Sequence, residues 1–208
     1  MLLALRNSIV REEFDYGSIK HALRAYKNPR VKINDLLRKG HIIRIKKGIY
    51  IFGPEMARGS YSKETLANLL YGPSYISLEY ALSFYGLIPE RVETVTSITN
   101  KRNKLFNTPI GVFSYRYIHP SLYPDGITLY KLDDQRSILI ACREKAVSDI
   151  LYFSKEMTGQ PRLEQYLFDD LRMDPQELSR FNLRMTKKLA GIYGANVRLF
   201  YHLLEGLK

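Results

Sequence analysis

The segment from Asp15 to Gly53 constrains the fold of this chain more than any other stretch, because it concentrates positive charge between clear helix and turn signals. From residue 20 to residue 47 it carries ten lysines and arginines, and Asp35 is its one acidic residue. Such a charge density on a small helical module is typical of proteins that bind the phosphate backbone of nucleic acids. The ten basic residues are Lys20, Arg24, Lys27, Arg30, Lys32, Arg38, Lys39, Arg44, Lys46 and Lys47.

Two short helices are predicted in the first part of this segment. The first covers about residues 18–23. Asn28 suits the N-cap of the second helix, and Pro29 suits its first turn, where the missing N–H costs nothing. This second helix runs to about Lys39, and Gly40 ends it. The side chains expected to face inward are Ile19, Ala22 and Leu23 on the first helix and Ile33, Leu36 and Leu37 on the second.

A hairpin is predicted directly after these helices. Its strands, Ile42–Lys46 and Ile49–Phe52, are rich in β-branched and aromatic residues, and Gly48 supplies the positive φ of a tight turn. Basic residues alternate with isoleucines along the first strand, so we expect one basic face and one apolar face. Two helices followed by a hairpin are the plan of a winged helix-turn-helix. We predict that it forms an N-terminal DNA-binding domain of residues 1–56.

A further helix, from residue 1 to about residue 12, is expected to complete the core of this domain. Its apolar face would consist of leucine, isoleucine and valine side chains, with Arg6 and Arg11 outside that face.

Candidate DNA contacts follow from the same plan. The second helix of the segment would be the recognition helix, with Arg30, Lys32 and Asn34 near base edges. Arg38 would also read or clamp the major groove. The basic hairpin would rest on phosphate or in a minor groove. One such module reads only a few base pairs, so two copies on a repeated site are expected. The alternative is that these charges form the solvated face of a structural domain. The candidates are Lys20, Arg24, Lys27, Asn28, Arg30, Lys32, Asn34, Arg38, Arg44, Lys46 and Lys47.

Composition narrows the class of protein. The net charge is +11, but residues 1–58 carry 13 basic against 5 acidic residues, whereas residues 59–208 carry 19 against 16. The basic character therefore belongs mainly to the N-terminal module. The single cysteine, Cys142, excludes an internal disulfide and is expected to be buried packing. No Cys/His cluster has zinc spacing, and no apolar run is long enough for a signal peptide core or a membrane span. We expect a cytoplasmic protein with no metal, no cofactor and no membrane partner.

Residues 57–208 predict a C-terminal α+β domain, in which a small, mostly antiparallel sheet of about four strands is packed with helices. Helices are expected over about residues 63–70 and 78–85, capped by Ser62 and Ser77. The predicted strands are Val92–Thr99, Val112–Ile118, Ile127–Leu132 and Ser137–Ala141. The later helices are predicted at Arg143–Phe153, Arg162–Leu171, Pro175 to as far as Ala190, and Val197–Leu204, with interruptions at Gly191 and Gly194.

Three basic residues of this domain, Lys101, Arg102 and Arg116, are candidates for a second functional surface. Arg116 stands among serine and aromatic residues of a strand and would contact DNA, a nucleotide or a partner protein; pairing with a local carboxylate is the alternative. Ser97 and Thr99 are expected on the solvent face of their strand.

An enzymatic role is not supported by any motif. Glu144 and Lys145 are adjacent on a predicted helix, whereas a restriction-type nuclease needs Asp and Glu-x-Lys on neighbouring strands to hold a divalent metal. Lys145 and Asp149 are spaced i, i+4, which favours a surface ion pair over an acid/base pair. The sequence has no P-loop, HExxH or G-x-S-x-G motif. We therefore expect no catalytic residues.

The chain nevertheless resembles a known family. After the hairpin motif HIIRIKKGIYIF (residues 41–52) come SYISLEYALSFYGLIPE (74–90), TSITNKR (96–102), FNTPIGVFSYRYIHP (106–120) and REKAVSDILYF (143–153). In that order, these motifs are similar to those of the AbiEi antitoxins, the regulators of abortive-infection toxin–antitoxin operons.

The resemblance implies a transcriptional autorepressor that binds double-stranded DNA at its own operon promoter through the winged helix. It also implies an antitoxin that counters a nucleotidyltransferase-like toxin from the same operon, in the type IV manner, without a stable complex. Two alternatives stay open: an enzyme whose C-terminal domain modifies the toxin or nucleic acid, and a DNA-binding regulator without a toxin partner.

Overall fold

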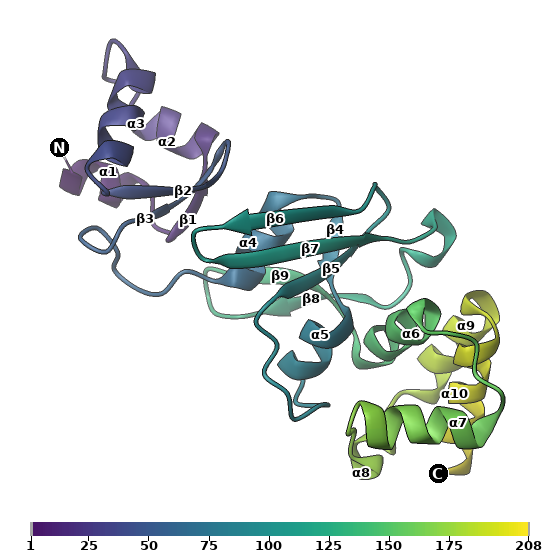
Figure 1. The fold of residues 1–208 in the computed structure, drawn as a ribbon. Helices are drawn as coiled ribbons and strands as arrows, with labels where there is room; N and C mark the ends of the chain where they lie inside the picture. Colours follow the sequence, from purple (N-terminus) through teal and green to yellow (C-terminus); the bar gives the residue numbers. More distant parts are fainter. Residues whose placement is uncertain (1, 208) are drawn as a thin grey trace.

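The computed structural model describes residues 2–207 and has the α+β architecture predicted from the sequence (Figure 1). An N-terminal module, defined here as the elements up to residue 56, precedes a larger C-terminal module with a sheet and a helical layer. The elements of the N-terminal module are α1 (Leu2–Ser8), β1 (Glu13–Asp15), α2 (Tyr16–Ala22), α3 (Pro29–Arg38), β2 (Ile42–Lys46) and β3 (Ile49–Phe52). Both predicted hairpin strands are confirmed residue for residue, and the two predicted helices within a few residues.

Local sequence signals account for these boundaries. Asp15 caps α2, because its carboxylate accepts a hydrogen bond from Ser18 N at 2.7 Å. Pro29 begins α3, whereas Asn28 takes the N-cap position without a side-chain hydrogen bond. Gly40 follows α3 with φ of 72°, a left-handed conformation that favours glycine.

The N-terminal module differs from the prediction at its start. The first helix ends at Ser8 instead of residue 12, and β1 adds a third, antiparallel strand beside β3, in the order β1-β3-β2. Arg6, predicted outside the core, is buried, and Val10, predicted within the apolar face, is 65% exposed. The guanidinium of Arg6 donates to the backbone carbonyls of Ile9 and Met56, so burial leaves its donors satisfied.

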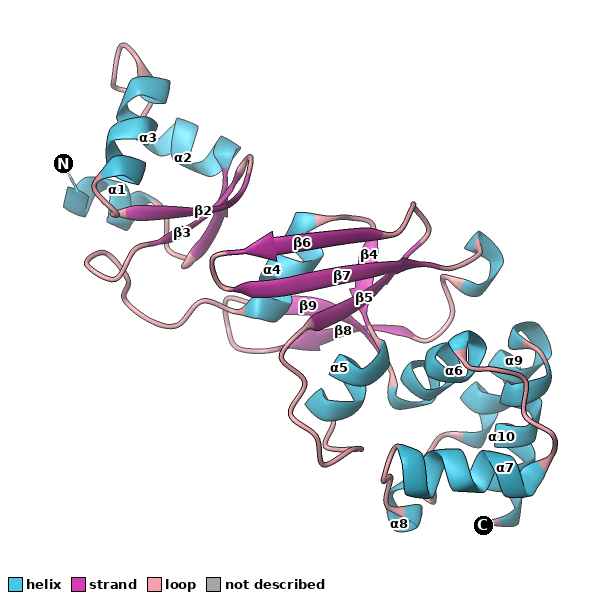
Figure 2. Cartoon of the chain, viewed as in Figure 1, coloured by secondary structure: helices cyan, strands magenta, loops and turns pink. Residues whose placement is uncertain are grey.

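The C-terminal module is built on a mixed sheet of six strands in the order β6-β7-β5-β4-β9-β8 (Figure 2). Its elements up to the end of the sheet are α4 (Lys63–Leu70), β4 (Ser74–Ile76), α5 (Leu78–Phe84), β5 (Val95–Thr99), β6 (Lys104–Thr108), β7 (Gly111–Tyr117), the 3₁₀ turn η1 (Pro120–Leu122), β8 (Ile127–Lys131) and β9 (Ser137–Ala141). The predicted number of about four strands is too low, because the described sheet has six. Three of its five pairings are antiparallel, as predicted for most of the sheet, whereas β4–β9 and β5–β7 pair in parallel.

The two missed strands have weak local signals. β4 has only three residues, too few for a period of two to show. β6 is an edge strand with the polar residues Lys104, Asn107 and Thr108, which resembled a turn in the sequence. The predicted strand from Val92 also starts late, at Val95.

A helical layer completes the chain. It comprises α6 (Arg143–Phe153), α7 (Gln160–Gln165) with the π-helical turn η2 (Tyr166–Asp170), α8 (Pro175–Leu178), α9 (Leu183–Tyr193) and α10 (Ala195–Gly206). The predicted helix from Pro175 to Ala190 is wrong: Asn182 caps a new helix by accepting from Met185 N at 3.1 Å. Gly191 lies inside α9, and Gly194, with φ of 106°, separates α9 from α10.

The β2–β3 hairpin packs on both of its faces. Ile42, Tyr50 and Phe52 belong to the hydrophobic cluster of the N-terminal module, which reaches Met56. Ile45 and Ile51 instead belong to the large cluster of the C-terminal module. The isoleucine face of β2, predicted only to be apolar, is therefore part of the surface on which the two modules meet. Within residues 2–207, none of the helices has the length and apolar character needed to cross a membrane.

Candidate nucleic-acid interface

A groove of about 720 Å³ separates α3 from the β2–β3 hairpin. Four of the predicted DNA contacts line it, two from each side, and none of the described residues that line it is acidic. Tyr16 N donates to Gly48 O at 2.8 Å, which ties the start of α2 to the hairpin tip beside the groove. The lining residues are Tyr16, Arg30, Ile33, Asn34, Arg44, Lys47, Gly48 and Tyr50.

On α3, one exposed stripe carries Arg30, Asn34 and Arg38, because residues four apart lie above one another on a helix. Arg30 and Asn34 line the groove. The Arg30 Nε lies 3.4 Å from the Tyr16 hydroxyl, and this contact raises the pKa of Arg30. The guanidinium is therefore a permanent cation at the mouth of the groove.

Asp35 organises the basic side chains on the neighbouring face of α3. Its carboxylate lies 3.1 Å from Lys32 Nζ, 2.9 Å from the Arg38 guanidinium and 3.3 Å from Lys39 Nζ. These partners, Lys32 first, hold the pKa of Asp35 well below its ordinary range. Lys32 is half-buried in this ion-pair cluster and lies outside the groove, so the structure separates it from Arg30 and Asn34.

The basic residues of the hairpin point to two different places. Arg44 and Lys47 are exposed and line the groove. Lys46 instead donates to Leu70 O at 2.7 Å, at the end of α4, and its Nζ lies 4.7 Å from the centre of the Phe106 ring. Burial and the nearby Lys104 lower the pKa of Lys46. A shift of pairing register between Arg44 and Lys46 marks a β-bulge, and the Lys46 side chain beyond it bonds to the C-terminal module.

The remaining N-terminal candidates lie outside the groove. Lys20, Arg24, Lys27 and Asn28 are exposed on α2 and in the turn before α3. Arg24 contacts the ring of His21 at 2.5 Å. These positions extend the basic surface without joining the groove itself.

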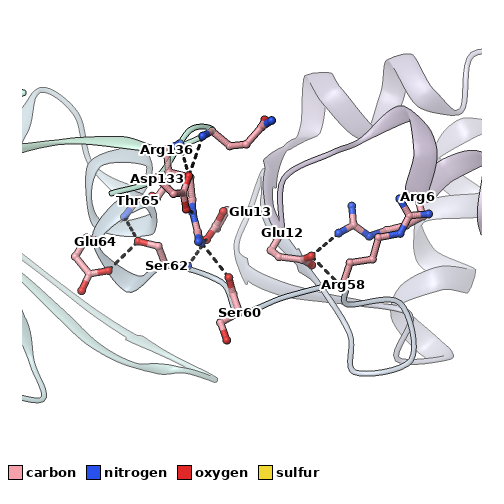
Figure 3. Close-up of polar contacts among 11 residues, drawn as sticks. Arg6, Glu12, Glu13, Arg58, Ser60, Ser62, Glu64, Thr65, Asp133 and Arg136 are labelled. Carbon is pink, nitrogen blue, oxygen red and sulfur yellow. Dashed lines mark hydrogen bonds and ion pairs between the residues drawn. The ribbon is translucent and has the colours of Figure 1, made fainter. Parts of the chain in front are cut away.

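The junction between the modules centres on Glu13, whose side chain is fully buried (Figure 3). Its carboxylate accepts from Arg136, at 3.2 Å, and from Ser62 N. Arg136 also donates to Ser60 O at 2.9 Å and to Asp133 at 2.6 Å. One acidic side chain of β1 thus connects the linker, the start of α4 and the β8–β9 turn.

Glu12, directly before β1, makes a second set of contacts on the opposite side of the chain from those of Glu13 (Figure 3). Its carboxylate pairs with the buried Arg6 and accepts from Arg58 N at 3.0 Å. This junction was not predicted from the sequence. The adjacent glutamates beside an arginine-rich segment were the only signal, and the partner Arg136 lies more than a hundred residues away.

The three candidates in the C-terminal module do not gather at one place. Lys101 donates to Gly72 O at 2.6 Å and lies over the Tyr71 ring, and Arg102 is exposed beside it in the sequence. Arg116 stacks its guanidinium 3.8 Å over the Phe153 ring on α6. The alternative prediction for Arg116 was an ion pair with a nearby carboxylate. Within residues 2–207 no such ion pair is present, and the Arg116 guanidinium instead makes a cation–π contact with the Phe153 ring.

The prediction of a surface ion pair between Lys145 and Asp149 is wrong, because the pair lies in the core. Both side chains are completely buried, with Nζ 3.7 Å from Oδ1. Asp149 accepts from the hydroxyls of Ser77, Tyr75 and Tyr193 at 2.6, 3.0 and 2.5 Å. Burial raises the pKa of Asp149 and lowers that of Lys145. Because both side chains are completely buried, this cluster is a polar centre of the core.

Ser77 explains part of this arrangement. It occupies the predicted N-cap of α5 but turns its hydroxyl to Asp149 instead of the helix backbone. Ser97 and Thr99, predicted on the solvent face, are also fully buried, because sheet strands β4 and β7 flank β5 and both of its faces are covered. Cys142, half-buried at the start of α6, has its pKa raised to about 12 by burial.

Between residues 2 and 207, no three His, Cys, Asp or Glu side chains gather closely enough to hold a metal ion. Comparison with known proteins found no matching family model and no matching curated protein.

Proposed function

We propose that the chain is a DNA-binding transcriptional autorepressor whose N-terminal module is a winged helix-turn-helix. In this proposal α2 and α3 are the two helices of the motif, α3 is the recognition helix, and the β2–β3 hairpin is the wing. The observation that carries the proposal is the groove between α3 and the hairpin, lined by Arg30, Asn34, Arg44 and Lys47 without an acidic residue.

The proposed docking on duplex DNA follows the usual plan of such modules. A recognition helix in the major groove and a wing on the adjacent backbone straddle one sugar–phosphate strand, and that strand would lie in the groove between them. Arg44 and Lys47 supply phosphate contacts there, while Arg30 and Asn34 reach base edges, where arginine selects guanine and asparagine selects adenine. Lys20, Arg24 and Lys27 add longer-range attraction.

We propose further that the protein acts as an antitoxin of the AbiEi type, countering a nucleotidyltransferase-like toxin encoded in the same operon. The order of motifs described above supports this role. Two copies on a repeated operator are expected, since one module reads only a few base pairs.

A binding titration tests the DNA-binding role. A duplex from directly upstream of the gene is titrated at two salt concentrations, with a scrambled duplex of equal length as control. We expect tight, selective binding that weakens as salt increases. Equal and weak binding to both duplexes would reject the repressor role.

Expression of the neighbouring open reading frame tests the antitoxin role. We expect the neighbour to arrest growth alone and to be neutralised by co-expression of this chain, without a complex that survives gel filtration. A neighbour that is harmless alone would leave a regulator without a toxin partner. A covalent change in the toxin, with Mg²⁺ and nucleotide triphosphates present, would favour an enzyme instead.

A further inference from the structure

Val31 is an exposed apolar side chain on the helix proposed to read DNA. It lies in the first turn of α3, between Arg30 and Lys32, and is 67% exposed. Within Pro29–Arg38 the other apolar side chains are buried or half-buried. A valine on this surface has no role in the core of the protein.

The position of Val31 relates it to the proposed DNA contacts. Along the exposed arc of α3 it follows Arg30 by one residue and precedes Asn34 by three, about 4.5 Å along the helix axis. Residues near the N-terminus of a recognition helix are those that reach base edges. Val31 would therefore face the same few base pairs as Arg30 and Asn34.

Only one chemical group in the major groove suits such a side chain. The edges of guanine, cytosine and adenine present hydrogen-bond donors and acceptors, whereas thymine also presents its C5-methyl group. We infer that Val31 reads a thymine by packing against this methyl group. The inference rests on the proposed DNA-binding function and adds a base preference to it.

Uracil provides the test, because it differs from thymine only by the missing methyl group. Each thymine of the upstream duplex is replaced in turn by deoxyuridine, and the dissociation constants are measured for the wild type and for Val31→Ala. Removing a methyl contact of about 0.8 kcal/mol or slightly more corresponds to a four- to tenfold weaker complex. We expect a loss of this size for the wild type at one or two thymines and no loss there for Val31→Ala.

A matched control is available in the same module. Val10 is 65% exposed and lies before β1, on a segment separate from α3. Val10→Ala should retain the full sensitivity to uracil. Both variants are expected to fold, since alanine at an exposed position of α3 raises helix propensity and Val10 has little burial to lose.

Two outcomes would overturn the inference while leaving the proposed function intact. One is selective, salt-dependent binding in which no deoxyuridine substitution weakens the wild type. The other is a Val31→Ala protein that remains as sensitive to uracil as the wild type. If no variant binds the upstream duplex selectively at any salt concentration, the proposed function fails and the inference fails with it.

Discussion

The Arg136 guanidinium lies 3.2 Å from the buried carboxylate of Glu13 and joins the β8–β9 turn to β1 across 123 positions of the sequence (Figure 3). Lys46 makes a second connection, from β2 to the backbone of Leu70. Because β1 and β2 lie on either side of β3, the two contacts hold both edges of the N-terminal sheet against the C-terminal module. Residues outside the N-terminal module thus contact both edges of the sheet that carries the hairpin.

Replacing Arg136 tests this connection. Arg136→Ala leaves the Glu13 carboxylate buried without its cationic partner, so we expect a loss of about 2–3 kcal/mol in the free energy of unfolding, measured in urea. Arg180→Ala is the control, because Arg180 makes an exposed i, i+3 pair with Glu177. Its cost should stay below about 0.5 kcal/mol. Equal costs for the two variants would contradict a structural role for the Glu13–Arg136 pair.

Lys47 and Lys46 are adjacent but should respond differently. Lys47→Ala is expected to weaken binding to all duplexes and to reduce the slope of log K against log salt by about one unit, because one phosphate contact is lost. Lys46→Ala should leave that slope nearly unchanged and lower stability, since its ammonium bonds to Leu70 O. Lys155→Ala, at an exposed site after α6, is the control for charge alone. A larger change of slope for Lys46 than for Lys47 would reverse our assignment.

Arg30 and Asn34 should govern selectivity more than general affinity. Replacing either with alanine is expected to cost about 1–3 kcal/mol on the upstream duplex and much less on the scrambled one, because each would lose a base-edge contact. Lys32→Ala is a suitable comparison, since Lys32 is held by Asp35 outside the groove. The measurement is a competition titration with single-base variants of the site. Unchanged selectivity in the Arg30 and Asn34 variants would exclude α3 as the reading element.

The buried Lys145–Asp149 pair predicts a large effect on stability. Lys145→Met removes the cation beside a completely buried carboxylate, and we expect a loss of about 3–5 kcal/mol in equilibrium unfolding. Lys188→Met removes the partner of Asp125 in an exposed pair and should cost about 1 kcal/mol or less. Similar costs would indicate that the Lys145 site admits water.

Cys142 gives a prediction that depends on pH. Burial raises the pKa of its thiol to about 12, compared with about 8.5 for a free thiol. The folded state therefore favours the protonated thiol, and its contribution to stability is complete below about pH 8.5 and declines as the pH rises toward 12.

The rate of reaction with an aromatic disulfide reagent measures this shift. In the native protein it should be slow at pH 8 and should rise about tenfold per pH unit up to pH 10, whereas in urea it should level off above about pH 9. A native rate that levels off near pH 8.5 would show an ordinary thiol.

The amino-acid sequence by itself determined the local structure where its signals are strong. The strands Ile42–Lys46 and Ser137–Ala141 and the helix Arg143–Phe153 agree with the prediction residue for residue. Their signals, a hydrophobic period of two or 3.6 residues and a matching residue composition, act within a few residues and do not need the rest of the chain. The same is true of the presence of Arg30, Asn34, Arg44 and Lys47 within one short segment, in which three of these four side chains are cationic.

Only the tertiary structure decided which of these residues act together. The pairing of β4 with β9 joins segments more than 60 residues apart, and no local pattern specifies such a register. Lys46 and Lys47 look alike in the sequence, but one bonds to the C-terminal module and the other lines the groove. The burial of Lys145 and Asp149 likewise could not be predicted from their neighbours in the sequence. A polar residue can be buried when distant elements supply its hydrogen bonds. The free energy of burying it therefore depends on partners that lie far from it in the sequence.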